Sequence, residues 1–127
     1  MGKVVQAIRL TNFVDPSKSV EVEALVDTGA TMLSLPVDLV ERLGLQKFSE
    51  VAVRYADNRT DRKGVYGVVT LEINGRRGHF DVLAEKTGTS PLIGQIVLEE
   101  LDLVVSPKTG SLMPNPQSPE MPRMDML

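Results

Sequence analysis

The sequence predicts an all-β domain that carries two short helices. Apolar and polar residues alternate in several segments of strand length, and turn-forming residues separate these segments. The order strand, strand, apolar run ending in glycine, helix occurs twice, first up to Gly44 and again up to Leu101. The two halves share no residue-level repeat, so this order indicates an internal two-fold arrangement of elements. The chain has 127 residues, which is the length of one domain.

The first predicted elements are strands. Alternation over residues 4–13 and again over residues 20–26 predicts two strands. Asp15-Pro16-Ser17-Lys18 favours a turn between them, because proline fixes φ and the Asp and Ser side chains bond locally. The second strand becomes wholly apolar near its end, which indicates that it enters the core. Residues 32–35 form a short apolar continuation after the next turn.

Residues 36–43 give the clearest helical pattern. Pro36 suits the first position of a helix, and Gly44 is placed to end it. Leu39, Val40 and Leu43 form the apolar stripe that would face the core.

A projecting hairpin is predicted in the middle of the chain. The predicted strands are residues 51–55, 65–73 and 79–84. The stretch 56–64 between the first two is polar and rich in turn-forming residues, which is typical of a hairpin tip exposed to water. Asn74-Gly75 is the signature of a two-residue type I′ turn between the second and third strands.

The last part of the predicted domain pairs a helix with a small hairpin. After a loop at residues 85–91, Leu92-Ile93-Gly94 is a second apolar run that ends in glycine. Residues 95–101 read as a helix with mostly buried apolar side chains: Ile96, Val97, Leu98 and Leu101. Residues 103–105 and 111–113 form a terminal hairpin. Four prolines follow within residues 114–127, which predicts a flexible Pro/Met-rich tail.

The composition excludes several classes of site. The chain has no cysteine, so disulfide scaffolds and thiolate metal sites are excluded. The single histidine, His79, reads as a solvent-facing strand residue, and we expect neither a metal nor another cofactor. The net charge is −3 with interspersed signs, so we expect no nucleic-acid partner. No apolar stretch is long enough for a signal peptide or a membrane span, so we expect a cytoplasmic protein without a membrane partner.

Asp27 stands at the end of an apolar run, where an ionisable side chain is unusual. It begins the tripeptide Asp27-Thr28-Gly29. The structural interpretation is that the Asp side chain bonds to its own backbone and Gly takes the turn. A bare Asp-Thr-Gly arises by chance in roughly a few per cent of chains of this length. The tripeptide alone therefore does not distinguish a structural turn from an active carboxylate.

Three features together resemble the retropepsin-type aspartic proteases, the single-lobe class of retroviral proteases and stand-alone prokaryotic relatives. Leu-Val-Asp-Thr-Gly-Ala at residues 25–30 resembles the catalytic motif. The hairpin at 51–70 lies where the family has its flap, and Leu92-Ile93-Gly94 resembles the second apolar-Gly element before the family's C-terminal helix. Residues 101–110 look most like the prokaryotic members. The resemblance implies a single-lobe acid protease barrel over residues 1–113, followed by the tail at 114–127.

The resemblance also implies an activity, peptide hydrolysis by two carboxylates that share a proton. Because the chain has one Asp-Thr-Gly, the implied site requires a symmetric homodimer with one Asp27 from each subunit. Thr28 would then hold the two active-site loops together, and Gly29 would let the substrate backbone approach. Ala30 offers no hydroxyl to the ionised carboxylate, so we expect an optimum around pH 5 to 6.

The implied flap tip consists of Ala56, Asp57, Asn58 and Arg59, which would close over a polypeptide substrate. It is charged, whereas retroviral members have a glycine-rich tip. Retroviral members also carry an acidic residue shortly after the motif and an Arg after the second glycine. The matching residues here, Thr31 and Gln95, are both neutral.

Two other functions compete with the protease interpretation. The first is a non-catalytic dimerisation or peptide-binding module of the same fold, in which Asp27 is only a turn residue. The second is a metal-dependent hydrolase, which is disfavoured because the sequence offers no ligand cluster.

Overall fold

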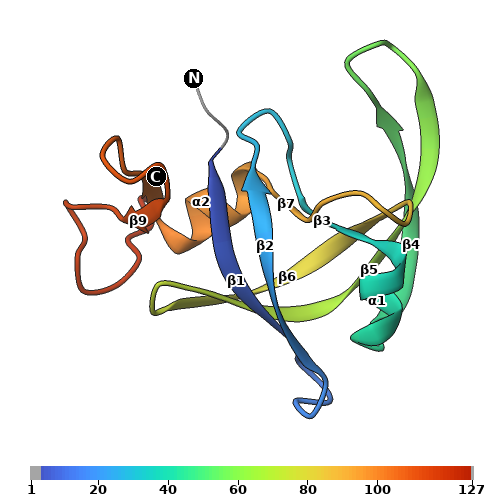
Figure 1. Cartoon of the computed structure of the whole chain (residues 1–127), viewed down its shortest axis with the longest axis horizontal. Helices are drawn as coiled ribbons and strands as arrows, with labels where there is room; N and C mark the ends of the chain where they lie inside the picture. The colour runs from blue at the N-terminus through green and yellow to red at the C-terminus, as the bar shows by residue number, and fades with distance from the viewer. Residues whose placement is uncertain (1–3, 127) are drawn as a thin grey trace.

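Six strands close into a barrel because strand β1 is paired along both of its edges (Figure 1). The computed structural model describes residues 4–126. Within them the strands are β1 (Val5–Asn12), β2 (Ser19–Val26), β3 (Leu33–Pro36), β4 (Gln46–Arg54), β5 (Thr60–Ile73), β6 (Arg76–Glu85), β7 (Leu92–Ile93), β8 (Leu103–Val105) and β9 (Leu112–Pro114), and the helices are α1 (Val37–Arg42) and α2 (Gln95–Leu101).

The barrel runs in the order β1-β2-β7-β3-β6-β5 and returns to β1, while β4 pairs with the outer part of β5. The short strand β7 lies between β2 and β3, parallel to β2 and antiparallel to β3. Side chains from both halves of the chain fill the interior, and the largest fully buried ones include Leu10, Leu35, Leu71, Ile73, Ile93 and Leu101. The predicted all-β class with two short helices is confirmed.

Several local predictions hold to the residue. The second helix spans 95–101 as predicted. Asn74 (φ 48°) and Gly75 (φ 83°) connect β5 to β6 through a two-residue turn with Ile73 paired to Arg76. Positive φ at both turn residues is the property of a type I′ turn, which an Asn-Gly pair adopts with little strain.

The strands around the projecting hairpin are longer than predicted. Strand β4 begins at Gln46 and β5 at Thr60, so residues 60–64, expected in the polar tip, belong to a strand. Cross-strand pairing between β4 and β5 forms this ribbon although nearly all of β4 faces water, so burial patterns could not reveal it. Strand β6 likewise starts at Arg76 and not at residue 79. The first helix starts one residue late, because Pro36 is extended (ψ 148°) and serves as the N-cap.

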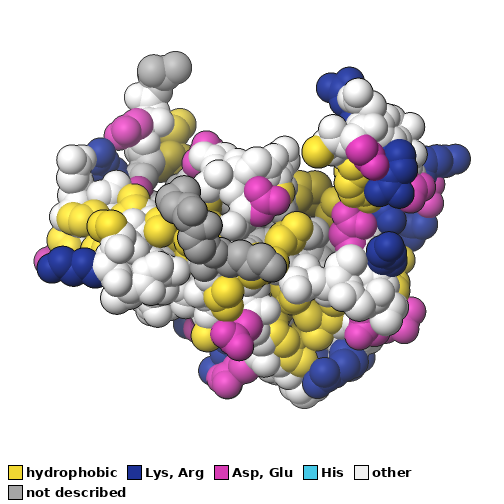
Figure 2. Space-filling model, turned by 45° about the horizontal axis from the view of Figure 1, so that its top comes forward, with side chains coloured by type: hydrophobic (Ala, Val, Ile, Leu, Met, Phe, Trp, Pro, Cys, Tyr) yellow, Lys and Arg dark blue, Asp and Glu magenta, His cyan; other side chains and the backbone are white. Residues whose placement is uncertain are grey.

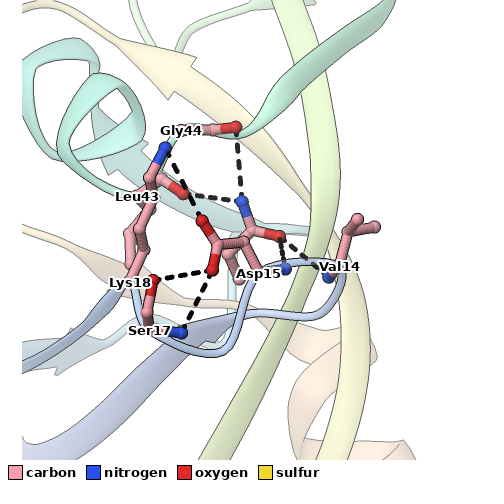
Figure 3. A network of polar contacts seen from close by, with 7 residues as sticks. Val14, Asp15, Ser17, Lys18, Leu43 and Gly44 are labelled. Atoms are coloured by element: carbon pink, nitrogen blue, oxygen red, sulfur yellow. Dashed lines mark hydrogen bonds and ion pairs between the residues drawn. The ribbon is translucent and has the colours of Figure 1, made fainter.

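The side chain of Asn12 fastens the turn between β1 and β2 to the end of α1. Figure 3 labels its partners Val14, Asp15, Leu43 and Gly44. The Asn12 Nδ2 donates to the carbonyl oxygens of Leu43 (2.8 Å) and Gly44 (3.3 Å). Its Oδ1 accepts the backbone N–H groups of Val14 and Asp15. Carbonyls at a helix end lack partners within the helix, so this buried amide satisfies two of them and fixes the turn at the same time.

The beginning of the Pro/Met-rich segment contacts the body of the domain. The buried Arg76 donates to the carbonyl oxygens of Leu101 (2.9 Å) and Asp102 (2.8 Å) at the end of α2, and also to that of Ser118. The Asn115 N–H donates to the Asp102 carbonyl oxygen at 3.0 Å. These bonds hold residues 115–118 on the body, while the flexibility of the whole tail remains a prediction.

The pH dependence of this tail contact follows from Asp102. The Ser118 hydroxyl, the Asn115 amide and the Arg123 N–H donate to its carboxylate, in that order of effect, and hold its pKa below the usual range. A lowered pKa stabilises the folded contact above the unfolded value of about 3.9, and this stabilisation is lost as pH falls through the folded pKa. We expect the hydrogen-exchange protection factor of the Arg123 N–H to fall between pH 5 and pH 2.5. The Ser106 N–H, bonded to the Ser111 carbonyl, serves as the control; equal changes at both amides would contradict this assignment.

Candidate functional site

Asp27 immediately follows strand β2 and is held in place by the second half of the chain. Its backbone N–H donates to the Ile93 carbonyl oxygen at 3.0 Å, and two residues earlier the Leu25 N–H donates to the Pro91 carbonyl oxygen. The parallel pairing of β2 with β7 produces both bonds. The predicted entry of this strand into the core is confirmed at Ala24, which is 1% exposed, whereas Asp27 itself is exposed.

A tight turn then presents the Asp27 carboxylate. The Ala30 N–H donates to the Asp27 carbonyl oxygen at 3.1 Å, and the Gly29 N–H donates to the carboxylate Oδ1 at 2.9 Å. The second bond is also the one that a purely structural turn residue would make. Within residues 4–126 no hydrogen bond engages Oδ2, so one carboxylate oxygen of this exposed residue has no partner there. The turn therefore fixes the carboxyl group and leaves it able to act on a bound molecule.

The loop after Asp27 is bonded to the start of helix α2. The N–H of Gln95 donates to the Ala30 carbonyl oxygen at 2.8 Å, and that of Ile96 donates to the Thr31 carbonyl oxygen at 3.0 Å. These are N–H groups that the first turn of a helix leaves free. Thr31 and Gln95, the neutral residues at the two places where retroviral members are charged, both take part in this contact through backbone groups. Thr31 contributes its carbonyl oxygen and Gln95 contributes its N–H.

Gly94 allows this close approach. A Cβ on Gly94 would lie 2.6 Å from the Met32 carbonyl oxygen and 2.8 Å from that of Ala30. Both are backbone atoms, so neither can rotate away. The second apolar-Gly element therefore has a steric explanation.

Thr28 lies beside Asp27 at the edge of an open groove of about 400 Å³. The opposite wall comes from α2 and from strand β8, including Leu98, Val104 and Val105. The last two are 36% and 40% exposed, which is high for adjacent valines in a strand. The groove thus joins the candidate site to an apolar patch next to the β8–β9 hairpin.

The predicted flap tip lies at the end of the ribbon formed by β4 and β5, and all four of its residues are exposed. The Asn58 N–H donates to the Tyr55 carbonyl oxygen, and Asn58 has a φ of 67°, which together define a tight, ordered turn. Arg59 pairs with Asp57 (3.0 Å) and its guanidinium lies 5.2 Å from the centre of the Tyr55 ring. Within residues 4–126, no hydrogen bond or ion pair links this tip to Asp27 or Thr28.

We call residues 50–64, the part of the ribbon beyond the first β5–β6 pair, the flap arm. Sequence reasoning missed its contact with the body. Lys63 pairs with Glu85 at 3.3 Å, and the Tyr55 hydroxyl donates to the same carboxylate at 3.2 Å. Partial burial lowers the pKa of Lys63, but the hydrogen bond and charge of Glu85 outweigh it and raise the pKa overall. Burial, followed by the Glu85 charge, raises the pKa of Tyr55.

Two further side-chain predictions have different outcomes. His79 is exposed on its strand as predicted, with its Nδ1 3.0 Å from the Thr70 hydroxyl. Ile96 was expected to be buried, and this is wrong, because it is 44% exposed. Helix α2 buries Val97, Leu98 and Leu101, and position 96 falls outside that stripe.

The described part of the chain has neither a metal-binding cluster nor a helix that could span a membrane. Over residues 4–126, no three His, Asp or Glu side chains are grouped closely enough to hold a metal ion. In the same range neither helix has the length and apolar character needed to cross a bilayer.

Comparison with known proteins gives one family and one fold. The model of the family described as "gag-polyprotein putative aspartyl protease" matches residues 18–100. Among solved structures, the EIAV protease complexed with the inhibitor HBY-793 is similar, with a TM-score of 0.60 and 17% sequence identity. The similarity covers 76% of this chain and 86% of that protease. No curated protein matches the sequence.

Replacing Gly94 by alanine tests the loop contact. Because the added Cβ would meet backbone oxygens, the start of α2 must move away from Ala30, and we expect unfolding to become easier by about 1 to 3 kcal/mol. Urea unfolding followed by circular dichroism measures this. Gly64→Ala is the matched control, since its Cβ would first meet the movable side chains of Tyr66 and Lys47. A Gly94→Ala chain as stable as the control would contradict the steric role.

Proposed function

The chain belongs to the retroviral-type aspartyl protease family and has the retropepsin fold, and we propose that it is an aspartic endopeptidase whose active site is assembled from two copies of the chain. The observation that carries the proposal is the position of Asp27. It follows strand β2 and is fixed by the Ile93 carbonyl oxygen and by the Gly29 N–H, and among residues 4–126 its second carboxylate oxygen has no hydrogen-bond partner. The chain has no cysteine, so it offers no thiol nucleophile, and it has a single histidine.

In the proposed reaction two Asp27 carboxyl groups share one proton across the two-fold axis. The ionised carboxylate removes a proton from a water molecule, whose oxygen attacks the carbonyl carbon of the peptide bond. The protonated carboxyl donates its proton to the carbonyl oxygen. The carboxyl group that took the water proton then passes it to the leaving nitrogen, and a hydroxyl of the intermediate returns its proton to the other carboxylate. The C–N bond breaks and gives a carboxylic acid and an amine. One chain provides only half of this machinery, because it contains a single Asp-Thr-Gly.

The surface beside Asp27 supports assembly of two copies. Thr28 and the exposed valines Val104 and Val105 border one continuous groove of about 400 Å³. A partner that covered this groove would bury apolar side chains and would bring a second Thr28 near the first. Symmetric pairing of one patch with itself is the commonest way in which identical chains associate. The proposed partner is therefore a second copy of the chain.

The exposed tip Ala56–Arg59 is the proposed cover of a bound polypeptide. A closing cover excludes water and strengthens electrostatic interactions at the reacting carbonyl. The Asp57–Arg59 pair neutralises the tip internally, so it presents little net charge to a substrate.

A non-catalytic peptide-binding or dimerisation module remains the second candidate. The observation in its favour is the Gly29 N–H bond to Asp27, which already gives the carboxylate a structural role.

The substitution Asp27→Asn distinguishes the two functions. An amide cannot take the proton of the attacking water, so we expect cleavage of an unstructured protein substrate near pH 5 to 6 to fall by about 100-fold or more. Thermal unfolding should change little, because the Asn oxygen can still accept the Gly29 N–H. Asp38→Asn, at an exposed carboxylate on α1, is the control and should retain full activity. Undiminished cleavage by the Asp27→Asn chain would exclude the proposed mechanism.

The dependence of activity on assembly gives a separate prediction. Val105→Asp places a charge in the apolar patch that the partner would cover, and burial of an unpaired charge is costly. We expect the dimer dissociation constant, measured by sedimentation equilibrium, to rise at least about tenfold, which corresponds to about 1.4 kcal/mol. Val14→Asp, at a side chain 84% exposed in the β1–β2 turn, should leave the dissociation constant unchanged. Equal effects of both variants, or a wild-type monomer with full activity, would contradict assembly through this patch.

A further inference from the structure

We propose that Glu85 is a positioning residue that fixes the flap arm relative to the catalytic loop through Tyr55 and Lys63. The inference rests on the proposed function, since it assigns a resting position to the cover of that active site. It names residues that neither the sequence pattern nor the family comparison singles out.

The first argument is that the flap arm has little else to hold it. Residues 50–64 pair only with one another, and β5 joins β6 only from Val65 inward. A two-stranded ribbon is marginally stable alone and bends easily. Figure 1 shows the arm standing out from the barrel on the same side as the loop after β2, and Figure 2 shows it as a projection with mixed charges. Its position relative to the loop after β2 therefore needs a specific attachment.

The second argument is the set of polar contacts that the arm makes. Within residues 4–126, the hydrogen bonds and ion pairs from arm side chains to residues outside the β4–β5 ribbon all end on Glu85. The Tyr55 hydroxyl lies 3.2 and 3.3 Å from the two carboxylate oxygens, and the Lys63 ammonium lies 3.3 Å from Oε1. The Glu85 carboxylate thus holds the arm on both sides of its turn, through Tyr55 directly after β4 and through Lys63 in β5.

The third argument is burial. The side chains of Lys63 and Glu85 are 17% and 18% exposed, whereas the ion pair within the arm between Arg62 and Glu50 is 81% and 42% exposed. Charges shielded from water are screened less by salt and by solvent, so the Glu85 contact outweighs the exposed pairs. Asp61 lies 3.4 Å from Lys63 on its other side, so the ammonium bridges two carboxylates.

The fourth argument is where Glu85 is located. It is the last residue of β6, paired in register with Pro36 of β3. The chain that follows it leads into β7, whose Ile93 carbonyl oxygen accepts the Asp27 N–H. A single loop, residues 86–91, therefore connects the residue that holds the arm to the strand that holds Asp27. The contacts of Glu85 therefore fix the resting position of the proposed cover relative to the loop that carries Asp27.

The experiment uses the absence of native cysteine to attach two spin labels, at Ala56→Cys on the tip and Glu41→Cys on α1. Distances are measured by pulsed electron resonance on labelled chains diluted into unlabelled ones. The Asp27→Asn background makes the measurement independent of catalysis. We expect Glu85→Gln to widen the distance distribution at least about twofold, and Tyr55→Phe, which keeps the Lys63 pair, to widen it less. Glu50→Gln removes two ion pairs within the ribbon, to Lys47 and Arg62, and should leave the distribution unchanged.

In the chain with Asp27 intact, Glu85→Gln should raise KM at least about threefold with a smaller change in kcat, and Tyr55→Phe should raise KM less. The reason is that a loosely held cover weakens substrate binding before it affects the chemical step. An unchanged distribution in both Glu85→Gln and Tyr55→Phe, or equal widening in Glu50→Gln, would overturn the proposal. If the distribution widens as expected but no chain cleaves peptide, the attachment stands and the proposed function fails.

Discussion

The rest of the structure depends on the contact between the loop that follows Asp27 and the start of helix α2. Two helix N–H groups reach the carbonyl oxygens of Ala30 and Thr31, and they do so because Gly94 has no side chain. The same crossing places Ile93 where its carbonyl oxygen accepts the Asp27 N–H. The second half of the chain therefore fixes the candidate catalytic residue of the first half. A change at this crossing would alter the orientation of Asp27 without touching its carboxylate.

The barrel explains how a small chain fixes the Asp27 carboxylate while forming only part of the proposed active site. Strand β2 carries Asp27 to the rim, and β7 and α2 hold the loop there. The loop borders an open groove that is lined by apolar side chains and by the polar residues Gln95, Glu99 and Asp102. A ribbon attached through Glu85 stands out on the same side of the barrel as the loop. In the proposed dimer a partner chain would cover the groove, and a peptide would bind beneath the tip of the ribbon. The surfaces that a single copy leaves exposed are therefore the ones that the proposed activity would use.

Sequence reasoning was accurate where the signal is local. Asn74-Gly75 defines its own turn, the helix at 95–101 has a clear apolar stripe, and Asp27-Thr28-Gly29 defines its own loop. It failed where the determinant is distant. Strand pairing at residues 60–64 depends on a partner strand facing water, and the Lys63–Glu85 pair joins residues far apart in the chain. No periodicity reports such contacts, because charged side chains in exposed segments resemble ordinary surface residues.

The central claim is that each Asp27 is half of an active site, and mixed dimers test it most directly. Wild-type and Asp27→Asn chains are mixed in equal amounts, allowed to exchange subunits, and assayed at constant total concentration. If catalysis needs both carboxylates, only dimers of two wild-type chains act, and activity falls to about one quarter of the wild-type value. An activity of one half, in proportion to the wild-type chains present, would show that each chain carries a complete site and would contradict the account.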